Sequence, residues 1–345
     1  MTVQRSPKRA TISDVARLAG VSIATVSRVL NGTAPVAEET MLQVNQAIAA
    51  LDFAPHAAAR TLAGRRTDTI GLLLPEISGA FYSPLIHGIE SSAREAGFDL
   101  LIHTTADRFR EGGRIQLPLD EHNTDGLLVF TDRLSDAELA RFHGRGFPLV
   151  LLYRSAPAGL DIPVVTLENK AGARGLVEHL IVTHGCRRIA FLAGPSGNED
   201  SSWREAGYRE ALRAHGIDDD PALHGLGDFD NGRARATVQQ WLSQGVLFDA
   251  IFAGDDDAAM GCIQALTEAG RRVPEDVAVV GFDDVLLAGL MVPRLTTVRT
   301  PIETAGRQAA RLLISLIQGE AVEQLVLLPT ELVIRQSCGC NGSLH

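Results

Sequence analysis

The stretch over residues 11–32, TISDVARLAGVSIATVSRVLNG, constrains the fold of this chain more than any other. Apolar residues recur at helical spacing over residues 12–19, and Gly20 can adopt the left-handed conformation that ends a helix. Ser22 is a favourable N-cap for a second helix over residues 23–31. A helix, a tight turn and a second helix that offers short polar side chains and one arginine predict a helix-turn-helix that fits the DNA major groove. A helical hairpin that merely caps a larger domain would give the same pattern.

The charge along the chain favours DNA binding. Residues 1–66 hold eight Lys or Arg and four Asp or Glu, a net charge of +4, whereas the whole chain carries −10 and the remainder therefore −14. An acidic protein with a basic N-terminal region is expected to bring only that region to phosphate. A third helix over residues 37–51, with Met41, Val44, Ile48 and Leu51 inward, would close a three-helix head.

The pattern T-I-x-D-V-A-x-x-A-G-V-S-x-x-T-V-S-R-V-L-N over residues 11–31 resembles the N-terminal signature of the LacI/GalR family of bacterial transcription regulators. On the second helix, Arg28 is expected to contact guanine, while Ile23 and Ala24 offer only apolar contacts, such as to a thymine methyl. Short hydroxyl side chains would hold phosphates. The predicted DNA-binding residues are Thr11, Ser22, Ile23, Ala24, Thr25, Ser27, Arg28, His56, Ala59 and Leu62.

A short alanine-rich segment follows the predicted head. Pro55 suits a first helical turn and Gly64 ends the helix, which at under three turns is too short to be stable alone. A plain helical linker is one interpretation. The resemblance implies instead a hinge helix that orders on operator DNA, with Leu62 as a wedge between base pairs in the minor groove.

From residue 69 onward short apolar runs alternate with helical patterns, which predicts parallel sheets with ligand crevices at the strand C-termini. The expected strands are 70–74, 100–103, 127–130, 149–153, 189–193, 250–253 and 277–282. The expected helices include 84–96, 171–182, 202–215 and 258–269.

The resemblance implies a periplasmic-binding-protein-like α/β core of two doubly wound parallel-sheet subdomains behind an all-α head and hinge helix. The chain would cross between subdomains near residues 166–169, 297–301 and 327–330. The predicted domains are a head over 1–54, a hinge helix and linker over 55–67, an N-subdomain over 68–166 plus 300–327, and a C-subdomain over 167–299 plus 328–345.

Polar and aromatic residues that follow the predicted strands are candidates for a ligand site. Carboxylates accept hydrogen bonds from sugar hydroxyls, arginine donates a planar fork, and an aromatic face stacks on a ring, so the set favours a polar, ring-shaped molecule. The candidates are Phe81, Tyr82, Tyr153, Arg204, Phe229, Asp255 and Asp283. The family resemblance implies effector contacts for four of them, on the motifs GPxGNxDxxxR, GDF, AGDDxAAxG and GFDD: Arg204, Phe229, Asp255 and Asp283.

Structural roles for these residues stay open. Asp255 or Asp256 could cap a helix, Arg204 could pair with a surface acid, and the aromatic residues could belong to the core. Tyr153 stands where several family members carry an aspartate, and either residue of the pair Glu168-Asn169 could face the ligand. The sequence shows no leucine heptads after residue 338, so the resemblance implies a dimer rather than a tetramer.

These observations predict a dimeric repressor in the cytoplasm, associated with the nucleoid, that a sugar or sugar derivative releases from a near-palindromic operator. A purine or nucleoside corepressor is the alternative effector. An enzyme or transport protein on the same core is the rival class, but the sequence holds no G-x-S-x-G elbow, P-loop, H-E-x-x-H or signal peptide. No cofactor is expected.

The four cysteines fit a reducing compartment. Cys338 and Cys340 form a C-x-C pair that could be a metal or redox site, but no histidine or further cysteine cluster accompanies it in the sequence. His103, His122, His179 and His184 are scattered along the chain. Ordinary reduced thiols and no metal site are therefore expected.

Overall fold

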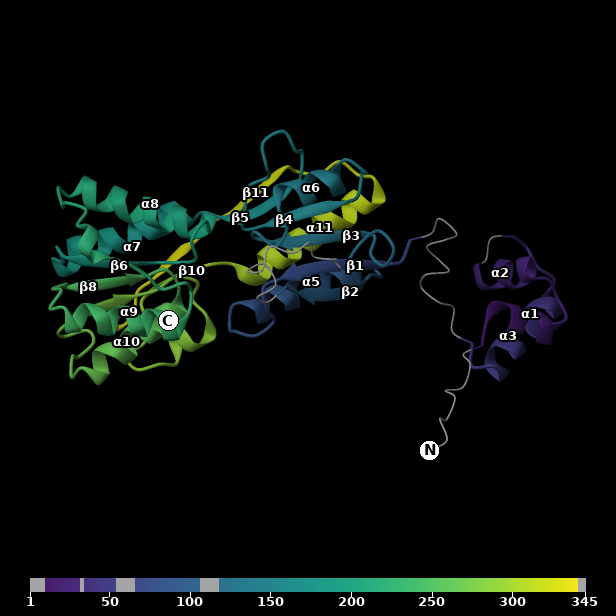
Figure 1. Ribbon diagram of the computed structural model, residues 1–345, viewed down its shortest axis with the longest axis horizontal. Coiled ribbons are helices and arrows are strands. Elements are labelled where there is room, and N and C mark those ends of the chain that lie inside the picture. The colour runs from purple at the N-terminus through teal and green to yellow at the C-terminus, as the bar shows by residue number, and fades with distance from the viewer. Residues whose placement is uncertain (1–9, 32–33, 54–65, 106–117, 341–345) are drawn as a thin grey trace, which may run out of the picture. The chain divides into compact units, whose positions relative to one another are not determined.

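The computed structural model describes residues 10–31, 34–53, 66–105 and 118–340 (Figure 1). The chain divides into two compact units, residues 1–67 and residues 68–345, and each is described by itself. No helix among the described residues combines the length and apolar character that a membrane span requires.

The first unit is a three-helix head made of α1 (Ile12–Ala19), α2 (Ile23–Asn31) and α3 (Glu38–Ala50). Gly20 ends α1 in the left-handed conformation, with φ of 66°, and the hydroxyl of Ser22 accepts a hydrogen bond from the Thr25 amide at 3.1 Å, so the predicted turn and cap are confirmed. The fully buried core of the head is Val15, Ala16, Val26, Val44 and Ala47.

One expected core residue of the head is wrong. Met41 is 43% exposed, and none of residues 38–43 in the first turns of α3 is buried. Only the later turns of α3 pack on the other helices, through Val44 and Ala47.

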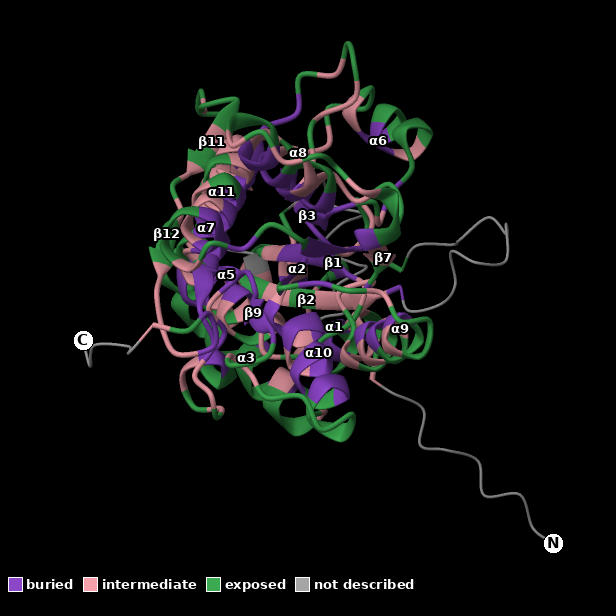
Figure 2. Ribbon diagram, turned by 90° about the vertical axis from the view of Figure 1, so that its left-hand side faces the viewer, coloured by how far each residue is buried: buried purple, intermediate pink, exposed green. Residues whose placement is uncertain are grey.

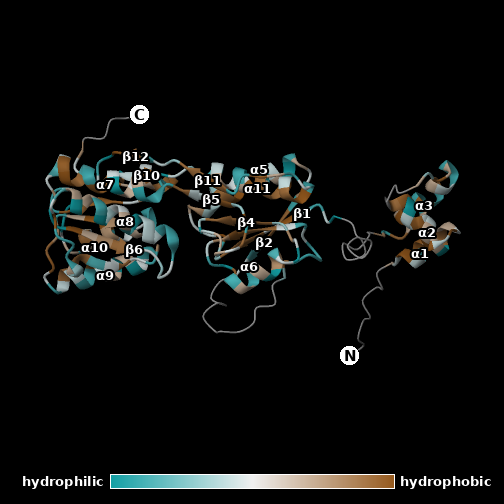
Figure 3. Ribbon diagram, turned by 90° about the horizontal axis from the view of Figure 1, so that it is seen from above, coloured by the Kyte–Doolittle hydropathy of each residue, from teal (hydrophilic) through white to brown (hydrophobic). Residues whose placement is uncertain are grey.

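The second unit contains a six-stranded parallel sheet in the order β11-β5-β4-β3-β1-β2. Its strands are β1 (Thr69–Leu74), β2 (Asp99–Thr104), β3 (Gly126–Phe130), β4 (Leu149–Leu152), β5 (Val164–Leu167) and β11 (Leu325–Leu328). Helices α5 (Tyr82–Glu95) and α11 (Ile302–Gln318) cover one face, and α6 (Asp136–His143) covers the other. The strands are hydrophobic, whereas α6 carries a hydrophilic outer face (Figure 3).

The same unit contains a four-stranded parallel sheet in the order β7-β6-β8-β9. Its strands are β6 (Ile189–Ala193), β7 (His224–Leu226), β8 (Ala250–Ala253) and β9 (Ala278–Val280). Helices α7 (Asn169–His184) and α8 (Glu199–Ala214) cover one face, and α9 (Asn231–Ser243) and α10 (Asp256–Glu268) cover the other. Strands β8 and β9 are buried throughout and β6 almost so, α10 is mostly buried (Figure 2), and the edge strand β7 is only partly buried.

A third, two-stranded antiparallel sheet accompanies the two parallel sheets. Strands β10 (Thr297–Arg299) and β12 (Glu331–Val333) pair with each other, and β10 continues beside β9 through bridges such as Val280 to Thr296. Two short 3-10 helices, η2 (Pro221–Leu223) and η3 (Leu286–Gly289), complete the described elements. The predicted all-α head and the α/β core of two parallel sheets are therefore confirmed. The predicted hinge helix lies outside the described residues, and the predicted domain boundaries stay a prediction.

Several element boundaries differ from the predicted ones for local reasons. The strand predicted over 149–153 ends at Leu152 because Tyr153 has a left-handed backbone, with φ of 59°. The strand predicted over 277–282 is cut to residues 278–280, before Asp283 with φ of 109°. Helix α5 starts two residues before the predicted Pro84, so Tyr82 lies in its first turn.

Candidate functional site

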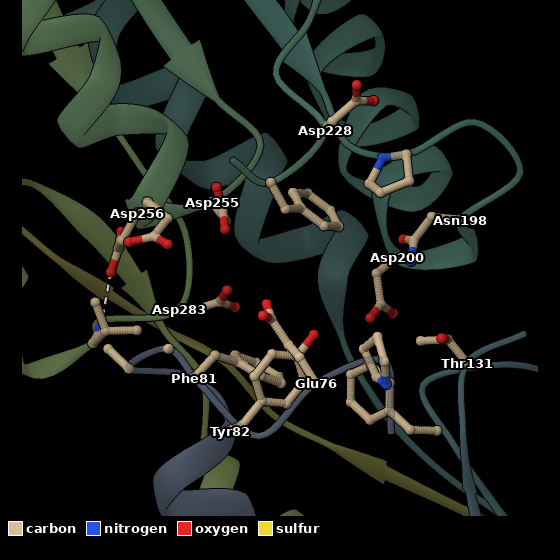
Figure 4. A pocket seen from close by; sticks show the side chains of 18 of the residues that line it. Glu76, Phe81, Tyr82, Thr131, Asn198, Asp200, Asp228, Asp255, Asp256 and Asp283 are labelled. Carbon is tan, nitrogen blue, oxygen red and sulfur yellow. Dashed lines mark hydrogen bonds between the residues drawn. The ribbon is translucent and has the colours of Figure 1, made fainter. Parts of the chain in front are cut away.

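A cavity of about 300 Å³ lies where the C-terminal ends of strands from both sheets meet. Loops after β1 and β3 of the first sheet line it, as do loops after β6, β7, β8 and β9 of the second. This is the place where parallel α/β sheets bind ligands. Figure 4 shows Asp200, Asp255 and Asp283 projecting into the space that Phe81 and Tyr82 border on one side.

Arg204 organises one wall of the cavity. Its side chain is 3% exposed and donates from Nε to Asn169 Oδ1 at 2.9 Å, from Nη1 to the Gly254 carbonyl at 2.6 Å and from Nη2 to Asp283 Oδ1 at 3.1 Å. The guanidinium also lies 3.9 Å from the centre of the Phe282 ring. The surface ion pair considered for Arg204 is therefore wrong, because its partner is the buried Asp283.

Two aspartates that follow β8, Asp255 and Asp256, both line the cavity and hold the neighbouring backbone in place. Asp255 caps α10 by accepting a hydrogen bond from the Ala258 amide at 2.9 Å, and it also lines the cavity. Asp256 accepts from the Thr297 hydroxyl at 2.6 Å and from the Val285 amide at 2.9 Å. Both of its carboxylate oxygens thus hold neighbouring segments, which makes Asp256 mainly structural.

Aromatic side chains form the opposite wall. The Phe81 ring centre lies 5.6 Å from that of Tyr82, 6.0 Å from that of Phe130 and 5.7 Å from that of Tyr153, all edge-to-face. Phe81, Tyr82 and Phe130 line the cavity, but Tyr153 does not. Tyr153 is 1% exposed and packs behind Phe81, with no hydrogen-bond partner for its hydroxyl among the described residues.

Phe229 reaches the cavity from the second sheet. Its backbone is left-handed, with φ of 56°, and its ring centre lies 5.4 Å from the Arg204 guanidinium. Gly194 lies so close to this ring that a side chain at position 194 would overlap it. The glycine of the Gly194-Pro195 turn therefore makes room for the aromatic ring.

Burial changes the ionisation of the cavity carboxyls. Burial, followed by the charge of Asp283, raises the pKa of Asp255 to about 8. Burial also raises the pKa of Asp200 to about 7, with Arg204 acting in the opposite direction. The pKa of Asp283 is raised by burial as well, although Arg204 counteracts this effect. The cavity thus gathers buried carboxyl groups, and hydrogen-bond donors on a ligand would stabilise their charged form.

Several lining residues were not among the predicted ones: Glu76, Thr131, Asp132, Arg133, Asn198, Asp200 and Asp228. Asn198 and Asp200 stand in the same loop motif as Arg204, and residues 131–133 directly follow β3, so strand-end position was a usable signal for them. Of the pair left open, Asn169 donates to Asp200 Oδ1 at 2.8 Å and supports the cavity wall, whereas Glu168 caps α7.

The predicted DNA-binding residues of the head lie on and around α2. Ser22, Ile23, Ala24 and Arg28 are exposed, while Thr25 and Ser27 are partly buried. Among the described residues Arg28 makes no hydrogen bond or ion pair, which leaves its guanidinium available. Thr11 is exposed and forms a capping box with Asp14 at the start of α1. The predicted hinge residues His56, Ala59 and Leu62 lie outside the described residues.

The C-terminal cysteines have histidine neighbours in the folded chain. The C-x-C pair has no histidine beside it in the sequence, but folding brings His179 and His184 of α7 to Cys338 and Cys340. The ligand atoms of these four side chains lie within 4.8 Å of one another. The sequence could not indicate this cluster, because more than 150 residues separate its two halves.

Comparison with known sequences gives two matching profiles. The profile for bacterial regulatory proteins of the lacI family matches residues 11–56, and that for a periplasmic binding protein-like domain matches residues 177–338. The chain is 37% identical to the HTH-type transcriptional regulator CelR of Thermobifida fusca, over 96% of this chain and 98% of the relative. It is 33% identical to the HTH-type transcriptional regulator GalR of Escherichia coli, over 97% of each chain.

Solved structures agree with the sequence matches. A complex of the transcriptional regulator CelR with cellobiose superimposes with a TM-score of 0.69 at 35% identity, over 95% of this chain and 100% of that one. The lac repressor dimer bound to operator and the anti-inducer ONPF superimposes with a TM-score of 0.77 at 29% identity, over 96% and 99%. Both similarities extend over the head as well as the core.

Proposed function

This chain belongs to the LacI family of bacterial regulatory proteins, and from that premise we propose that it is a dimeric transcriptional repressor released from operator DNA by a neutral sugar. The carboxyl-rich cavity between the two sheets is the observation that carries the effector part of this proposal. The relatives are named as transcriptional regulators, which supports regulation rather than catalysis.

The exposed face of α2 supports the DNA-binding part. Arg28 has a free guanidinium among the described residues and can donate two hydrogen bonds to a guanine in the major groove. Ile23, which is 50% exposed, and Ala24 offer apolar contacts such as to a thymine methyl. Thr11, Ser22, Thr25 and Ser27 would position the head on phosphates, and two heads of a dimer would read a near-palindromic site.

The balance of charge favours a neutral polyhydroxylated ligand over a phosphorylated one. Two arginines line the cavity, and both are engaged: Arg204 with Asp283, and Arg133 with Asp132. Among the described lining residues no further arginine or lysine is present to pair with a phosphate, and the lining acids outnumber the two arginines. Sugar hydroxyls can donate to Asp200, Asp255 and Asp283, while Phe229 or Phe81 stacks on the ring.

A purine or nucleoside corepressor is the second candidate, since Phe81, Tyr82 and Phe229 could also stack on a base. A thermal-shift screen of neutral sugars, sugar phosphates, nucleosides and purines separates the two candidates, because any ligand of the folded state raises the melting temperature. We expect a neutral sugar to give the shift. Asp283→Asn should abolish it, whereas Asp218→Asn, at an exposed aspartate away from the cavity, should not. A shift from purines alone, or one that survives in Asp283→Asn, would contradict the proposed effector site.

Ligand binding would act on DNA affinity by changing how the two halves of the core are held relative to each other. A differential affinity of about 1–3 kcal/mol between two such states is enough for a 5–150-fold change in operator binding. The proposed link to DNA is the hinge segment, where Leu62 would wedge into the minor groove together with contacts from His56 and Ala59.

Leu62→Ala tests this link. Without the apolar wedge, the kinked operator complex loses stability, so operator affinity should fall about tenfold or more while the sugar-induced thermal shift is unchanged. Fluorescence anisotropy with a selected operator measures the first quantity. Leu42→Ala, at an exposed position on α3, is a matched control that should retain operator affinity. Equal affinity of the Leu62→Ala variant and the wild type would remove the wedge from the proposal.

A further inference from the structure

Four metal-ligating side chains converge where the end of the chain meets α7. His179 Nε2 lies 3.3 Å from His184 Nε2, 3.5 Å from Cys338 Sγ and 3.6 Å from Cys340 Sγ. His184 Nε2 lies 3.4 Å from Cys340 Sγ. Cys338 is buried and the other three are partly buried. The cluster lies beside the four-stranded sheet, in the half of the core that this sheet and its helices form, and it shares no residue with the effector cavity.

Four of the six separations within this cluster match the edges of a zinc tetrahedron, and the other two are no longer than 4.8 Å. Zn²⁺ binds imidazole nitrogen at about 2.0 Å and thiolate sulfur at about 2.3 Å, usually with four ligands in tetrahedral geometry. Such a tetrahedron places its two nitrogens about 3.3 Å apart and each nitrogen about 3.5 Å from each sulfur. The four measured distances agree with these values. A single thiol–imidazole hydrogen bond would not require two histidines and two cysteines to lie within 4.8 Å of one another.

The backbone on both sides is shaped to bring the ligands together. His184 is the last residue of α7, and the left-handed Gly185 ends the helix there. Gly339 separates the two cysteines, with φ of 106° and its amide donating to the Gln336 carbonyl at 2.9 Å. A side chain at Gly339 would lie 3.2 Å from the His184 ring, so glycine provides both the turn and the space.

Neighbouring hydroxyl groups orient the ligands. Thr183 Oγ1 lies 3.2 Å from His179 Nδ1 and can accept its proton, which leaves the Nε2 lone pair directed at the cluster. Thr296 Oγ1 accepts the Arg335 amide at 2.8 Å, so its own proton points to Cys338 Sγ, 3.2 Å away. This hydrogen bond helps to hold the Cys338 sulfur in place beside the two histidines.

We propose that His179, His184, Cys338 and Cys340 bind one Zn²⁺ in a structural site. Two thiolates neutralise the ion, the two thiol protons leave to solvent on binding, and four protein ligands leave no open position for a substrate. A borderline-soft N₂S₂ set selects zinc over magnesium or calcium. The ion would fasten the terminal segment, which bonds to β9 through Ser337 and Val279, onto α7.

Metal analysis of the full-length protein tests the proposal. The protein is purified under reducing conditions with a tag that contains no histidine, loaded with Zn²⁺, desalted and analysed by inductively coupled plasma mass spectrometry. We expect about one zinc per chain in the wild type and in Cys262→Ala, whose cysteine is buried in another cluster. Cys340→Ser and His184→Asn should retain little or none. Wild-type protein without zinc, or Cys340→Ser with as much as Cys262→Ala, would overturn the site.

Two further measurements take their main readout from the wild type, so they test the site even if a variant fails to fold. Co²⁺ bound to the wild type should give the intense visible bands and sulfur-to-metal charge transfer of a tetrahedral thiolate site, and zinc should displace it. A chelator should lower the melting temperature of the wild type by several degrees and leave that of His184→Asn unchanged. Weak octahedral Co²⁺ bands, or a melting temperature that ignores the chelator, would contradict a structural zinc site. Because none of these readouts involves DNA or sugar, they stand apart from the proposed regulatory function.

Discussion

The two walls of the effector cavity are built in different ways. The wall from the second half is a hydrogen-bonded network in which Arg204 is fixed by Asn169, Asp283 and the Gly254 carbonyl. The wall from the first half is a set of aromatic rings, in which Phe81 contacts its neighbours edge-to-face. Hydrogen bonds fix direction and distance, whereas ring contacts tolerate small shifts.

This difference suggests a division of labour between the halves. The polar wall is organised before a ligand arrives and would decide which hydroxyl groups fit. The aromatic wall would supply contact area when the halves close on the ligand, with little demand on exact position. Changes on the polar wall should therefore affect both stability and specificity, and changes on the aromatic wall should affect mainly affinity.

The largest effect is expected for Arg204→Ala. It leaves the buried carboxylate of Asp283 without its partner, and breaking a buried ion pair costs about 3–5 kcal/mol. Urea unfolding should show this loss, and ligand binding should disappear. Arg209→Ala removes a half-exposed arginine from surface ion pairs and should cost about 1 kcal/mol or less. A similar small loss for both variants would refute the preorganised polar wall.

A smaller effect is expected on the opposite wall for Phe81→Leu. Leucine keeps most of the apolar volume but loses the edge-to-face contacts, which are worth about 0.5–1.5 kcal/mol. Sugar affinity measured by calorimetry should fall roughly tenfold, with the preference among sugars unchanged. Phe142→Leu, which alters an aromatic contact with Phe147 away from the cavity, should leave sugar affinity intact. A changed sugar preference in Phe81→Leu would show that the aromatic wall also sets specificity.

The sequence predicted the polar wall better than its surroundings, for a physical reason. Asp255 and Asp283 lie two and three residues after the apolar strands β8 and β9, so their position near the strand ends places them at the crevice. Tyr153 also follows a strand, but its left-handed backbone ends the strand there and its ring packs behind Phe81. Asp200 lies one turn before Arg204 on α8, in the same motif that follows β6, and was missed although that motif pointed to it.

The Cys-His cluster marks a stronger limit of the sequence. Its ligands become neighbours only when the C-terminal segment lies along β9 and α7, and that pairing has no local pattern. Helix and strand periodicity report contacts a few residues apart. Contacts between residues far apart in the chain become visible only in the folded structure.

The smallest expected change tests whether the polar wall costs stability. Burial and Asp283 raise the pKa of Asp255 to about 8, so the folded state keeps a proton that the unfolded state releases near pH 4. The contribution of Asp255 to stability is thus fully present below about pH 4 and is lost as the pH rises to about 8. An asparagine side chain at this position would still cap α10 but cannot ionise, so Asp255→Asn should melt like the wild type at pH 4 and increasingly above it as the pH rises to about 8.

Thermal unfolding across this pH range measures the difference, with Asp218→Asn as the exposed control that should follow the wild type throughout. An offset that grows with pH in Asp255→Asn, together with weaker sugar binding, would mean that the second half holds its carboxyls ready for hydroxyl donors at the expense of its own stability. An offset independent of pH would mean that Asp255 serves the helix cap alone, and the polar wall would then reduce to Arg204, Asp283 and Asp200.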